Sequence, residues 1–478
     1  MAFNSTAFLI FLFIVYFLYW KIFKTNLKLQ NLLLLISSYF FYGWWDWRFL
    51  SLIFISTFID YTLGLLINSS KKISDRKIFL TIGIVSNLGL LGFFKYFNFF
   101  IDSLNTLLST LSLPINTNTL SIILPVGISF YTFQSLSYTI DIYRNKIKPT
   151  KDIISFFSFV SFFPQLVAGP IERAENLLPQ FFIKRNFDYS NSVNGLRLIL
   201  WGLFKKIAIA DILAITVESV YNNPSEFDRL SLIIATIYFA IQIYCDFSGY
   251  SDIAIGTAKL FGFELMTNFK TPYFSSSIKE FWQRWHISLS TWFKDYLYIT
   301  LGGNRVSKKR NFFNIIITFT VSGFWHGANF TFIIWGFIHG FGYFIESKFT
   351  KLKFLFPKYI NHIITILIVL IAWIFFRAKS LADSFSILNR IFISDNNNKY
   401  SINECTINKF STYAEFFSGI VAILVLFIID YKSRKTNASI FFETFSKPTR
   451  YVIYYVLIVW IFIFGQFQNA PQFIYFQF

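Results

Sequence analysis

Two histidines are the residues of this chain that are best suited to chemistry. His286 and His326 are two of its four histidines, and both lie in sequence rich in Trp and Phe, FWQRWHISLSTWF from Phe281 and GFWHG from Gly323. An imidazole in such apolar surroundings usually serves a pathway or a reaction. Neutral imidazole is an effective general base near pH 7. The stretch that holds the pair is therefore the candidate catalytic region.

The composition indicates that this region is held by a membrane protein. Of the 478 residues, 55% are hydrophobic and 22% are aromatic, whereas only 14% are charged. The formal net charge of +18 invites the idea of nucleic-acid binding, but the Lys and Arg residues form short clusters between long apolar runs. That pattern is typical of the cytoplasmic loops of membrane proteins. We therefore expect the lipid bilayer as a partner and no nucleic acid.

Apolar runs of about twenty residues predict the membrane crossings. The first runs are Ala7–Trp20, Leu29–Trp44, Phe49–Ile67, Phe79–Phe97 and Ile122–Tyr143. The first has neither a basic leader nor a cleavage site, so we expect a retained helix rather than a signal peptide. Basic clusters follow the first, third and fifth runs, whereas residues 102–120 contain no Lys or Arg. The positive-inside rule therefore puts the N-terminus outside the cytoplasm.

The next segments combine apolar and polar residues. The segment Ile153–Gly169 is apolar but short and contains Pro164, so it predicts a re-entrant element. The span Leu196–Val220 contains Lys205, Lys206 and Asp211. The two lysines either snorkel towards the interface or face the protein interior, and we expect snorkelling for at least one of them.

The crossing Leu230–Tyr244 runs into a second polar stretch. There we expect a helix break that is locked by hydrogen bonds between Asp246, Ser248, Ser251 and Asp252, with close helix approach at Gly249 and Gly256. The acids lack calcium-loop spacing and a neighbouring His, and Cys245 and Cys405 are too differently placed for a disulfide or a zinc site. We therefore expect no metal.

The candidate catalytic region itself is mixed in character. Residues 271–310 are too aromatic for a free loop and too charged for a crossing, which predicts an amphipathic helix at the cytoplasmic interface. Trp282, His286 and Ser290 are four residues apart and would share one face of that helix. The run Phe312–Ile345 has basic sequence at both ends, so it predicts two helices whose turn puts His326 inside the membrane.

The remaining chain predicts further crossings at Ile363–Phe376, Phe416–Ile429 and Tyr451–Phe467, with a polar external loop at Asp383–Thr412. The total is an all-α polytopic bundle of about eleven crossings with re-entrant and interfacial helices. Neither an internal repeat nor a soluble domain is evident. We therefore expect a single integral-membrane domain over 1–478, made of N-terminal spans (1–143), a catalytic core (144–345) and C-terminal spans (346–478). His339, in the catalytic core, is expected to be structural, and His362, in the C-terminal spans, is expected to be an interfacial residue.

Five segments resemble the bacterial membrane-bound O-acyltransferases. They are PVGISFYTFQSLSYTIDIYR (125–144), FFPQLVAGPIERA (162–174), DFSGYSDIAIGTAKLFGF (246–263), FWQRWHISLSTWFKDYLYITLGGNR (281–305) and GFWHGANFTFIIWGFIHG (323–340). The resemblance extends to the branch that O-acetylates alginate or peptidoglycan. Thr300 stands where that family often has proline, which affects the local turn rather than the chemistry.

This resemblance implies a bundle around a central tunnel, with His326 as the catalytic histidine and His286 as a second functional histidine. It implies acyl transfer from a thioester to a hydroxyl, in which neutral His326 removes the hydroxyl proton. Donors to the developing oxyanion stay open among the backbone amides near Gly323 and Gly327, His286, and the Trp325 indole. The residues that we expect in the tunnel or at the substrate are Trp282, Trp285, Ser290, Trp325 and Asn329.

The donor and partners follow from the same resemblance. We expect no tightly bound cofactor, with acetyl-CoA or another acyl thioester as the donor substrate. Arg284, Lys294 and Arg305 either attract the donor phosphates or only set the topology. The expected location is the bacterial inner (cytoplasmic) membrane. Expected partners are an extracytoplasmic acetyltransferase and, for a carrier-bound donor, an acyl-carrier protein.

The function implied is transfer of an acyl group, with acetyl expected, from a cytosolic thioester across the membrane to an exported polysaccharide or peptidoglycan. The alternatives are D-alanyl transfer toward teichoic acid, a non-enzymatic transporter, and a scaffold for a secreted partner. A transporter would be expected to show broken helices in corresponding halves, and no such symmetry is evident.

Overall fold

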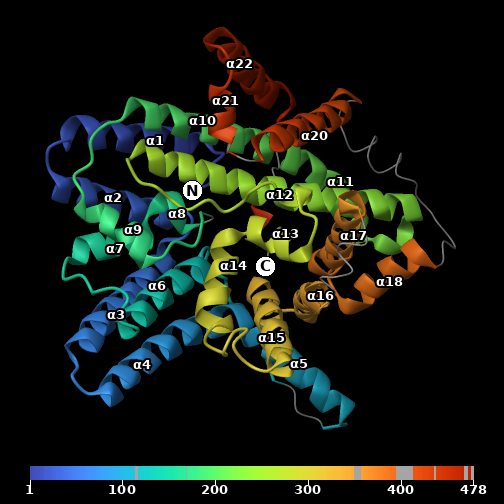
Figure 1. Cartoon of the computed structure of the whole chain (residues 1–478), viewed down its shortest axis with the longest axis horizontal. Coiled ribbons are helices and arrows are strands. Elements are labelled where there is room, and N and C mark those ends of the chain that lie inside the picture. Colours follow the sequence, from blue (N-terminus) through green and yellow to red (C-terminus); the bar gives the residue numbers. More distant parts are fainter. Residues whose placement is uncertain are drawn as a thin grey trace. The chain divides into compact units, whose positions relative to one another are not determined.

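The helical architecture that the composition predicts is present in the structure. The computed structural model describes residues 1–113, 117–167, 169–348, 357–393, 413–434, 436, 438–467 and 472–474, and its regular elements over these residues are helices (Figure 1). Five of the helical segments are long and apolar enough to cross a membrane: Trp47–Ser69, Ile73–Thr110, Arg229–Leu260, Lys358–Arg377 and Lys447–Phe464. Shorter apolar helices cover Thr6–Ile22 and Ile153–Leu166.

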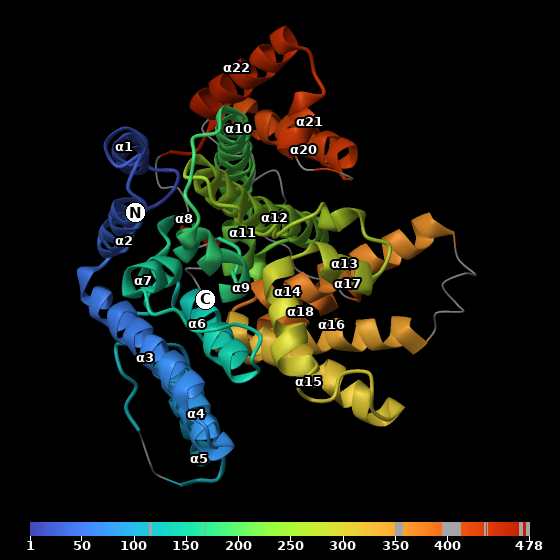
Figure 2. The ribbon, with the colours of Figure 1, turned by 60° about the vertical axis from the view of Figure 1, so that its left-hand side comes forward.

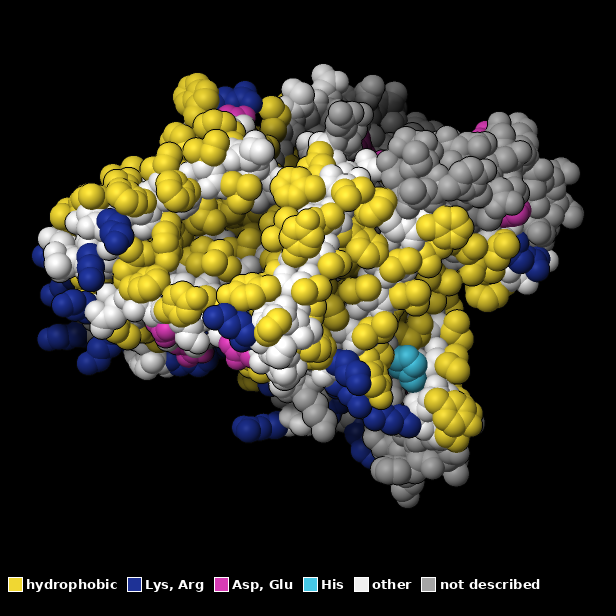
Figure 3. Space-filling model, turned by 90° about the horizontal axis from the view of Figure 1, so that it is seen from above, with side chains coloured by type: hydrophobic (Ala, Val, Ile, Leu, Met, Phe, Trp, Pro, Cys, Tyr) yellow, Lys and Arg dark blue, Asp and Glu magenta, His cyan; other side chains and the backbone are white. Residues whose placement is uncertain are grey.

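The surface is typical of a protein that lies in a lipid bilayer. Large apolar side chains are widely exposed, with Phe13 at 72% and Phe462 at 74%. On the face seen in Figure 3, apolar side chains predominate and the Lys and Arg side chains lie mostly near its margins. Exposed apolar patches of this extent would make a soluble protein aggregate. A bilayer accommodates such an apolar surface.

The chain forms two compact units. Met1–Gly195 together with Ala254–Met266 make the N-terminal unit, and Leu196–Ile253 together with Thr267–Phe478 make the C-terminal unit. Both histidines of the candidate catalytic region belong to the C-terminal unit. Each unit is described by itself below.

Helices form the first part of the N-terminal unit. They are α1 (Thr6–Phe17), α2 (Leu27–Gly43), α3 (Leu50–Ser69), α4 (Ile73–Leu91), α5 (Phe97–Thr110) and α6 (Ile128–Tyr143). Ser5 and Asn26 cap α1 and α2 by accepting hydrogen bonds from Phe8 N and Leu29 N. Helices α3, α4 and α6 lie side by side (Figure 2).

Two predicted spans of this unit have different limits. Helix α6 begins at Ile128 rather than Ile122, because Pro125 precedes it and Gly127 adopts a left-handed conformation with φ of 76°. The apolar helical segment that contains α4 runs to Thr110, well past the expected end at Phe97. The expected re-entrant segment is formed by two short helices, α7 (Ile153–Ser161) and α8 (Phe163–Leu166).

The expected break after Tyr244 is wrong. Helix α12 runs without interruption from Arg229 to Leu260, through all four polar residues. The polar side chains are satisfied by partners on other elements instead of by a break. Close approach at the glycines is confirmed, because a Cβ on Gly249 would lie 2.8 Å from the carbonyl oxygen of Gly202, and one on Gly195 would lie 2.6 Å from that of Gly256.

The expected snorkelling of at least one of the two lysines is also wrong, and the alternative, that they face the protein interior, holds. Lys205 ends α10 (Tyr189–Lys205), Lys206 begins a π-helical turn before α11 (Asp211–Asn222), and both side chains are buried. Lys205 Nζ lies 2.7 Å from Asp252 Oδ2. Lys206 Nζ lies 2.7 Å from Asp211 Oδ1 and 2.8 Å from Asp246 Oδ1. Buried ion pairs of this kind compensate the loss of hydration that snorkelling would have avoided.

The predicted pair of helices around His326 is confirmed. Helices α15 (Lys308–His326) and α16 (Phe330–Lys348) are joined by a short turn and contact each other along their length (Figure 2). Their backbones approach closely because glycines line the crossing: a Cβ on Gly323 would overlap the carbonyl oxygen of Phe332, and one on Gly336 would overlap that of Phe319.

We therefore expect Gly336→Ala to destabilise the C-terminal unit. The added methyl group meets backbone, which cannot rotate away, so α15 and α16 must separate at a cost of roughly 1–3 kcal/mol. The midpoint of thermal unfolding in detergent should fall. Gly89→Ala is the matched control, because a Cβ at this helical position has nothing within 4 Å. Equal shifts for the two variants would contradict the packing argument.

The C-terminal part consists of α17 (Lys358–Arg377), α18 (Leu381–Phe392), α20 (Tyr413–Ser433), α21 (Ala438–Glu443) and α22 (Lys447–Phe464). The expected loop at Asp383–Thr412 is wrong for its first part. There Ser380 caps α18 by accepting a hydrogen bond from Asp383 N. Residues 394–412, and with them Cys405, lie outside the described residues.

Candidate active site

His286 lies at a sharp turn between two short helices. Helix α13 (Ile278–Arg284) ends just before it and α14 (Ile287–Phe293) starts just after it, while His286 itself is left-handed with φ of 42°. The expected single amphipathic helix is therefore wrong. A left-handed residue other than Gly costs roughly 1–2 kcal/mol. The turn is held by backbone hydrogen bonds from Ile287 N to Asn268 O (2.9 Å) and from Lys270 N to Arg284 O (2.9 Å).

A hydrogen-bond network orients the His286 ring. Its Nδ1 lies 3.1 Å from Asn268 Oδ1, which also accepts from Ser288 Oγ at 2.9 Å. The backbone N–H of Ser288, which can only donate, also bonds to Asn268 Oδ1 at 3.2 Å, so the amide oxygen is the atom that faces the ring, while Asn268 Nδ2 donates to Ser251 Oγ at 3.2 Å. His286 Nδ1 therefore carries the proton, and Nε2 is left as the basic nitrogen. Sequence spacing gave no signal for Asn268.

The protonation state of His286 is set by its surroundings. The side chain is fully buried, and this burial lowers the pKa of His286 to about 3. Phe247 contacts the ring edge-on at a centroid distance of 4.6 Å. The imidazole is consequently neutral at physiological pH and can accept a proton or a hydrogen bond at Nε2.

The structure brings His326 next to His286. His326 is the last residue of α15 and is 3% exposed. Its ring centroid lies 6.2 Å from that of His286, 5.1 Å from that of Trp335 and 5.5 Å from that of Phe376. Two imidazoles at this separation can contact the same small substrate group. The aromatic side chains around the two imidazoles exclude water, and polar interactions are stronger where water is excluded.

A third histidine shares this aromatic cluster. His339 on α16 is fully buried, stacks on Phe281 at 6.0 Å and meets Trp282 and Trp335 edge-on at 5.0 Å each. Neither of its ring nitrogens has a hydrogen-bond partner among the described residues. Trp335 thus contacts both His326 and His339. The structural role that we expect for His339 stays a prediction.

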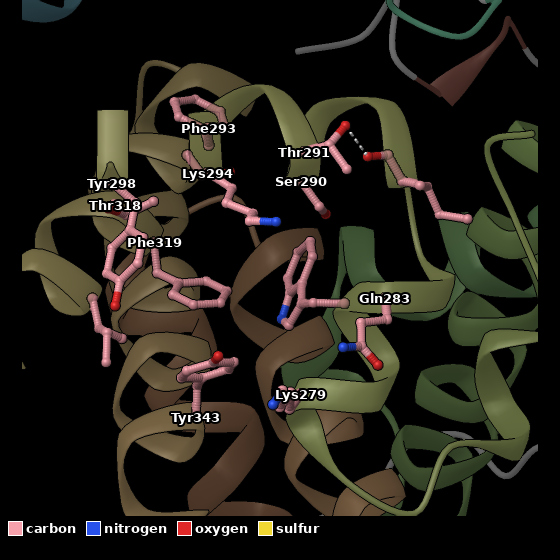
Figure 4. Close-up of a pocket in the computed structure, with 14 residues that line it drawn as sticks. Lys279, Gln283, Ser290, Thr291, Phe293, Lys294, Tyr298, Thr318, Phe319 and Tyr343 are labelled. Atoms are coloured by element: carbon pink, nitrogen blue, oxygen red, sulfur yellow. Dashed lines mark hydrogen bonds between the residues drawn. The ribbon is translucent and has the colours of Figure 1, made fainter. Parts of the chain in front are cut away.

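A cavity of about 410 Å³ lies in the C-terminal unit, and neither histidine is among the residues that line it (Figure 4). Side chains of α13, α14, α15 and α16 line it, among them Lys279, Trp282, Ser290, Lys294, Ser322 and Tyr343. Ile287, which follows His286, and Ser322, one helical turn before His326, are part of its wall. Figure 4 shows the Lys294 side chain pointing into this space.

Several of the residues expected at the substrate lie here. Trp282 and Ser290 line the cavity although no common helix face joins them. Trp325 lies against both catalytic-candidate rings, with centroid distances of 6.3 Å to His286 and 4.9 Å to His326. These three residues are therefore placed at the candidate site.

Trp285 and Asn329 have other surroundings. Trp285 is 1% exposed and packs against Phe281 and Trp373 in the core. Asn329 anchors the start of α16, because its Oδ1 accepts from Thr331 N and its Nδ2 donates to Lys379 O, each at 3.0 Å. Both residues support the site rather than line the cavity.

Of the three basic residues expected to meet the donor, only Lys294 lines the cavity. Arg284 NH2 lies 2.8 Å from Glu280 Oε1, four residues earlier on α13. Arg305 lies in the turn before α15, where its backbone N–H bonds to Gly302 O. Lys279 is a cavity residue that sequence reasoning missed, although its spacing of three from Trp282 on a helix could have indicated it.

A segment far along the chain also reaches the site. Phe473 packs against Tyr250 at 4.3 Å and Phe247 at 5.8 Å, and Phe247 is the ring that contacts His286. Ile474 N donates to Asp246 Oδ2 at 2.7 Å. The contacts support the Phe247 ring and hence the position of His286. Nothing in the local sequence predicted this.

Comparison with known proteins shows the family of the chain. Residues 144–385 match the membrane-bound O-acyltransferase family, and this segment contains both histidines. The probable alginate O-acetylase AlgI of Pseudomonas putida is 42% identical over 395 residues, 80% of this chain and 78% of the relative. The peptidoglycan O-acetyltransferase of Helicobacter pylori is 37% identical over 393 residues, 76% and 74% of the two chains.

A more distant similarity connects the chain to a teichoic acid D-alanyltransferase of Streptococcus thermophilus, which is 29% identical over 269 residues, 50% of this chain and 61% of the relative. The family match covers half of the chain, and the O-acetylating relatives are covered over about three quarters of their length. The chain therefore belongs to the membrane-bound O-acyltransferase family and is a multi-pass membrane acyltransferase.

Proposed function

We propose that this acyltransferase takes an acetyl group from a cytosolic thioester and delivers it across the membrane for O-acetylation of an exported polysaccharide or of peptidoglycan. The observation that carries the proposal is the pair of buried imidazoles, 6.2 Å apart, in the same unit as a cavity with lysines in its wall. The names of the relatives that are 42% and 37% identical support acetyl as the acyl group. An extracytoplasmic acetyltransferase is the proposed partner that passes the group to the glycan.

In the proposed reaction His326 is the general base. It removes the proton of the acceptor hydroxyl while the hydroxyl oxygen bonds to the thioester carbonyl carbon. The C–S bond then breaks, and the same proton passes to the leaving thiolate. His286, with its proton on Nδ1, is an acceptor at Nε2 and orients the hydroxyl or the protonated His326. Because His286 Nε2 carries no proton, it cannot donate to the developing oxyanion. The Trp325 indole N–H and the backbone amides near Gly327 are the proposed donors instead.

The cavity is the proposed entry of the donor. Lys279 and Lys294 bring two positive charges to its wall, and lysine is a common ligand of phosphate. This suits the phosphates of coenzyme A or of a carrier-protein phosphopantetheine. No resident cofactor is needed, because the thioester is already activated. We further propose about eleven crossings, a tunnel that joins the cavity to the opposite side, and one integral-membrane domain in the bacterial inner membrane.

Inverted membrane vesicles test the proposal directly. With acetyl-labelled coenzyme A or an acetylated carrier protein outside, label should become covalently bound to a luminal acceptor. Lys294→Ala should raise the KM for the donor about tenfold, since it removes a hydrogen bond to a charged group. Lys309→Ala, which changes a lysine that does not line the cavity, is the control.

Other outcomes would favour the alternatives. Transfer of D-alanine from a charged carrier, without acetyl transfer, would favour the teichoic acid reaction. Entry of an intact substrate without covalent labelling would favour a transporter. Full glycan acetylation in the absence of either histidine would favour a scaffold.

A further inference from the structure

The N-terminal unit contains a polar cavity that the proposed reaction does not use. Its volume is about 270 Å³, and its wall includes Trp20, Lys184, Arg185, Asp188 and Lys259. All of these residues belong to the N-terminal unit, whereas both histidines belong to the C-terminal unit. Three of the side chains in this wall, those of Lys184, Arg185 and Lys259, are cationic, and their positive charges require compensation in a membrane protein.

Arg185 is the central residue of this cavity. It is only 5% exposed, yet its hydrogen-bond acceptors are neutral: Gln180 O at 3.2 Å and Asn31 Oδ1 at 2.5 Å. Its guanidinium lies over the rings of Phe263 and Tyr19, 4.7 and 5.7 Å from their centroids. Arg185 Nε has no hydrogen-bond partner among the described residues. A buried guanidinium without a carboxylate is costly, and its planar donors suit phosphate.

The acidic groups around the cavity are engaged elsewhere. Asp188 Oδ1 accepts from Ser190 N at 2.8 Å and Asn191 N at 3.2 Å, which caps the start of α10. Glu264 holds Lys259 Nζ through both of its oxygens, at 2.6 and 2.7 Å. Lys259 is therefore already compensated. Arg185 and the neighbouring Lys184 remain as positive charges that no carboxylate of the described residues pairs with.

The position of the cavity along the chain points to the headgroup level of the bilayer. Trp20 lines the cavity and donates its indole N–H to Leu260 O at 2.9 Å. It is followed by Lys21, Lys24 and Lys28, the basic cluster that the positive-inside rule puts in the cytoplasm. Tryptophan favours the membrane interface, and the cytoplasmic leaflet is rich in anionic phosphates.

We propose that this cavity binds a phosphate group, supplied by the headgroup of an anionic phospholipid of the cytoplasmic leaflet, through Arg185 and Lys184. The buried guanidinium of Arg185 supplies hydrogen-bond donors to the site, and the exposed Lys184 adds a second positive charge to its wall. The same phosphate chemistry could be met by free phosphate, so the experiment separates the two sources. The inference is independent of the acyl-transfer proposal.

Binding of phosphatidylglycerol and of phosphatidylcholine to the purified full chain tests this, with native mass spectrometry as the readout. Wild-type protein should retain phosphatidylglycerol preferentially. Lys184→Ala should weaken that binding about tenfold, as expected for the loss of a hydrogen bond to a charged phosphate. Arg185→Gln should weaken it further. Lys28→Ala, a matched change in the neighbouring basic cluster outside the cavity wall, should leave it unchanged.

Each remaining outcome is decisive. Because Arg185→Gln removes packing as well as charge, its result counts only if its thermal midpoint stays near that of the wild type, and Lys184→Ala carries the test otherwise. Displacement of phosphatidylglycerol by inorganic phosphate would support the phosphate site but assign it to a free anion. Equal retention of the two lipids, or equal loss in Lys184→Ala and Lys28→Ala, would overturn the proposal.

Discussion

Replacing His326 by Ala is expected to abolish detectable O-acetylation while the amount of protein in the membrane stays the same. A general base contributes about 10²- to 10⁴-fold to a reaction rate, and His286, whose pKa burial lowers to about 3, is too weak a base to replace His326. His326→Gln keeps hydrogen bonding and much of the volume but cannot accept a proton at neutral pH. It should therefore be as inactive as His326→Ala. Glycan-bound acetate released by mild alkali is the measurement.

His362→Ala is the matched control for this experiment. Its ring lies away from the candidate site, where Nδ1 is 2.9 Å from Ser275 O. It should retain most of the activity. Acetylation at the wild-type level in both His326 variants would refute a base at this position, whatever the family relationship.

The second large effect is expected at Asn268. Asn268→Leu leaves the buried Nδ1–H of His286 without its acceptor, which costs about 1–3 kcal/mol. The tautomer with the proton on Nε2 then becomes available, so His286 loses its acceptor atom toward the site. Acetyl transfer should fall roughly 5- to 150-fold, if that cost appears in the activation free energy. Initial rates at saturating donor provide the measurement.

Asn268→Asp should produce a pH effect instead. Burial holds the pKa of His286 at about 3, so the wild-type ring is neutral throughout the usual assay range. A carboxylate at hydrogen-bond distance favours the imidazolium and raises the pKa of His286. Activity that needs the neutral ring is then lost as the pH falls below the raised pKa of His286. The acid side of the pH–activity profile should therefore move up into the range of about pH 5–8.

Asn176→Asp provides the same exchange at an exposed position and should leave the pH profile unchanged. If Asn268→Asp had the wild-type profile, His286 would not act as a neutral acceptor. A uniform loss of activity at every pH would indicate a structural effect only.

The parts of the fold that the sequence predicts well are those that depend on composition. The apolar runs predict helices that cross a bilayer, and basic residues at both ends of Phe312–Ile345 predict the α15 and α16 pair. The polar stretch within α12 misled the prediction, because its partners Lys205 and Lys206 lie about forty residues earlier. A local sequence pattern does not reveal that a lysine far away in the chain forms an ion pair with an aspartate. The interruption at His286 was equally hidden, since neither Gly nor Pro marks it.

The candidate site was predictable in its residues more than in its geometry. Trp282 and Ser290 line one cavity, although the single helix that was expected to align them is broken. Arg284 and Lys294 are both basic residues of the candidate catalytic region. Arg284, however, forms an ion pair with Glu280, and only Lys294 lines the cavity. Asn268, which fixes the tautomer, comes from a loop eighteen residues before His286. Its role depends on a chain reversal that spacing alone does not reveal.

The contacts of Phe473 and Ile474 with Tyr250, Phe247 and Asp246 have a consequence for biosynthesis. Helices that are inserted early cannot present a finished reaction centre, because the ring that supports His286 waits for residues translated much later. At about 5–20 residues per second, that delay lasts roughly 10–40 s. A nascent chain therefore lacks this support for the Phe247 ring until residues 473 and 474 have been made.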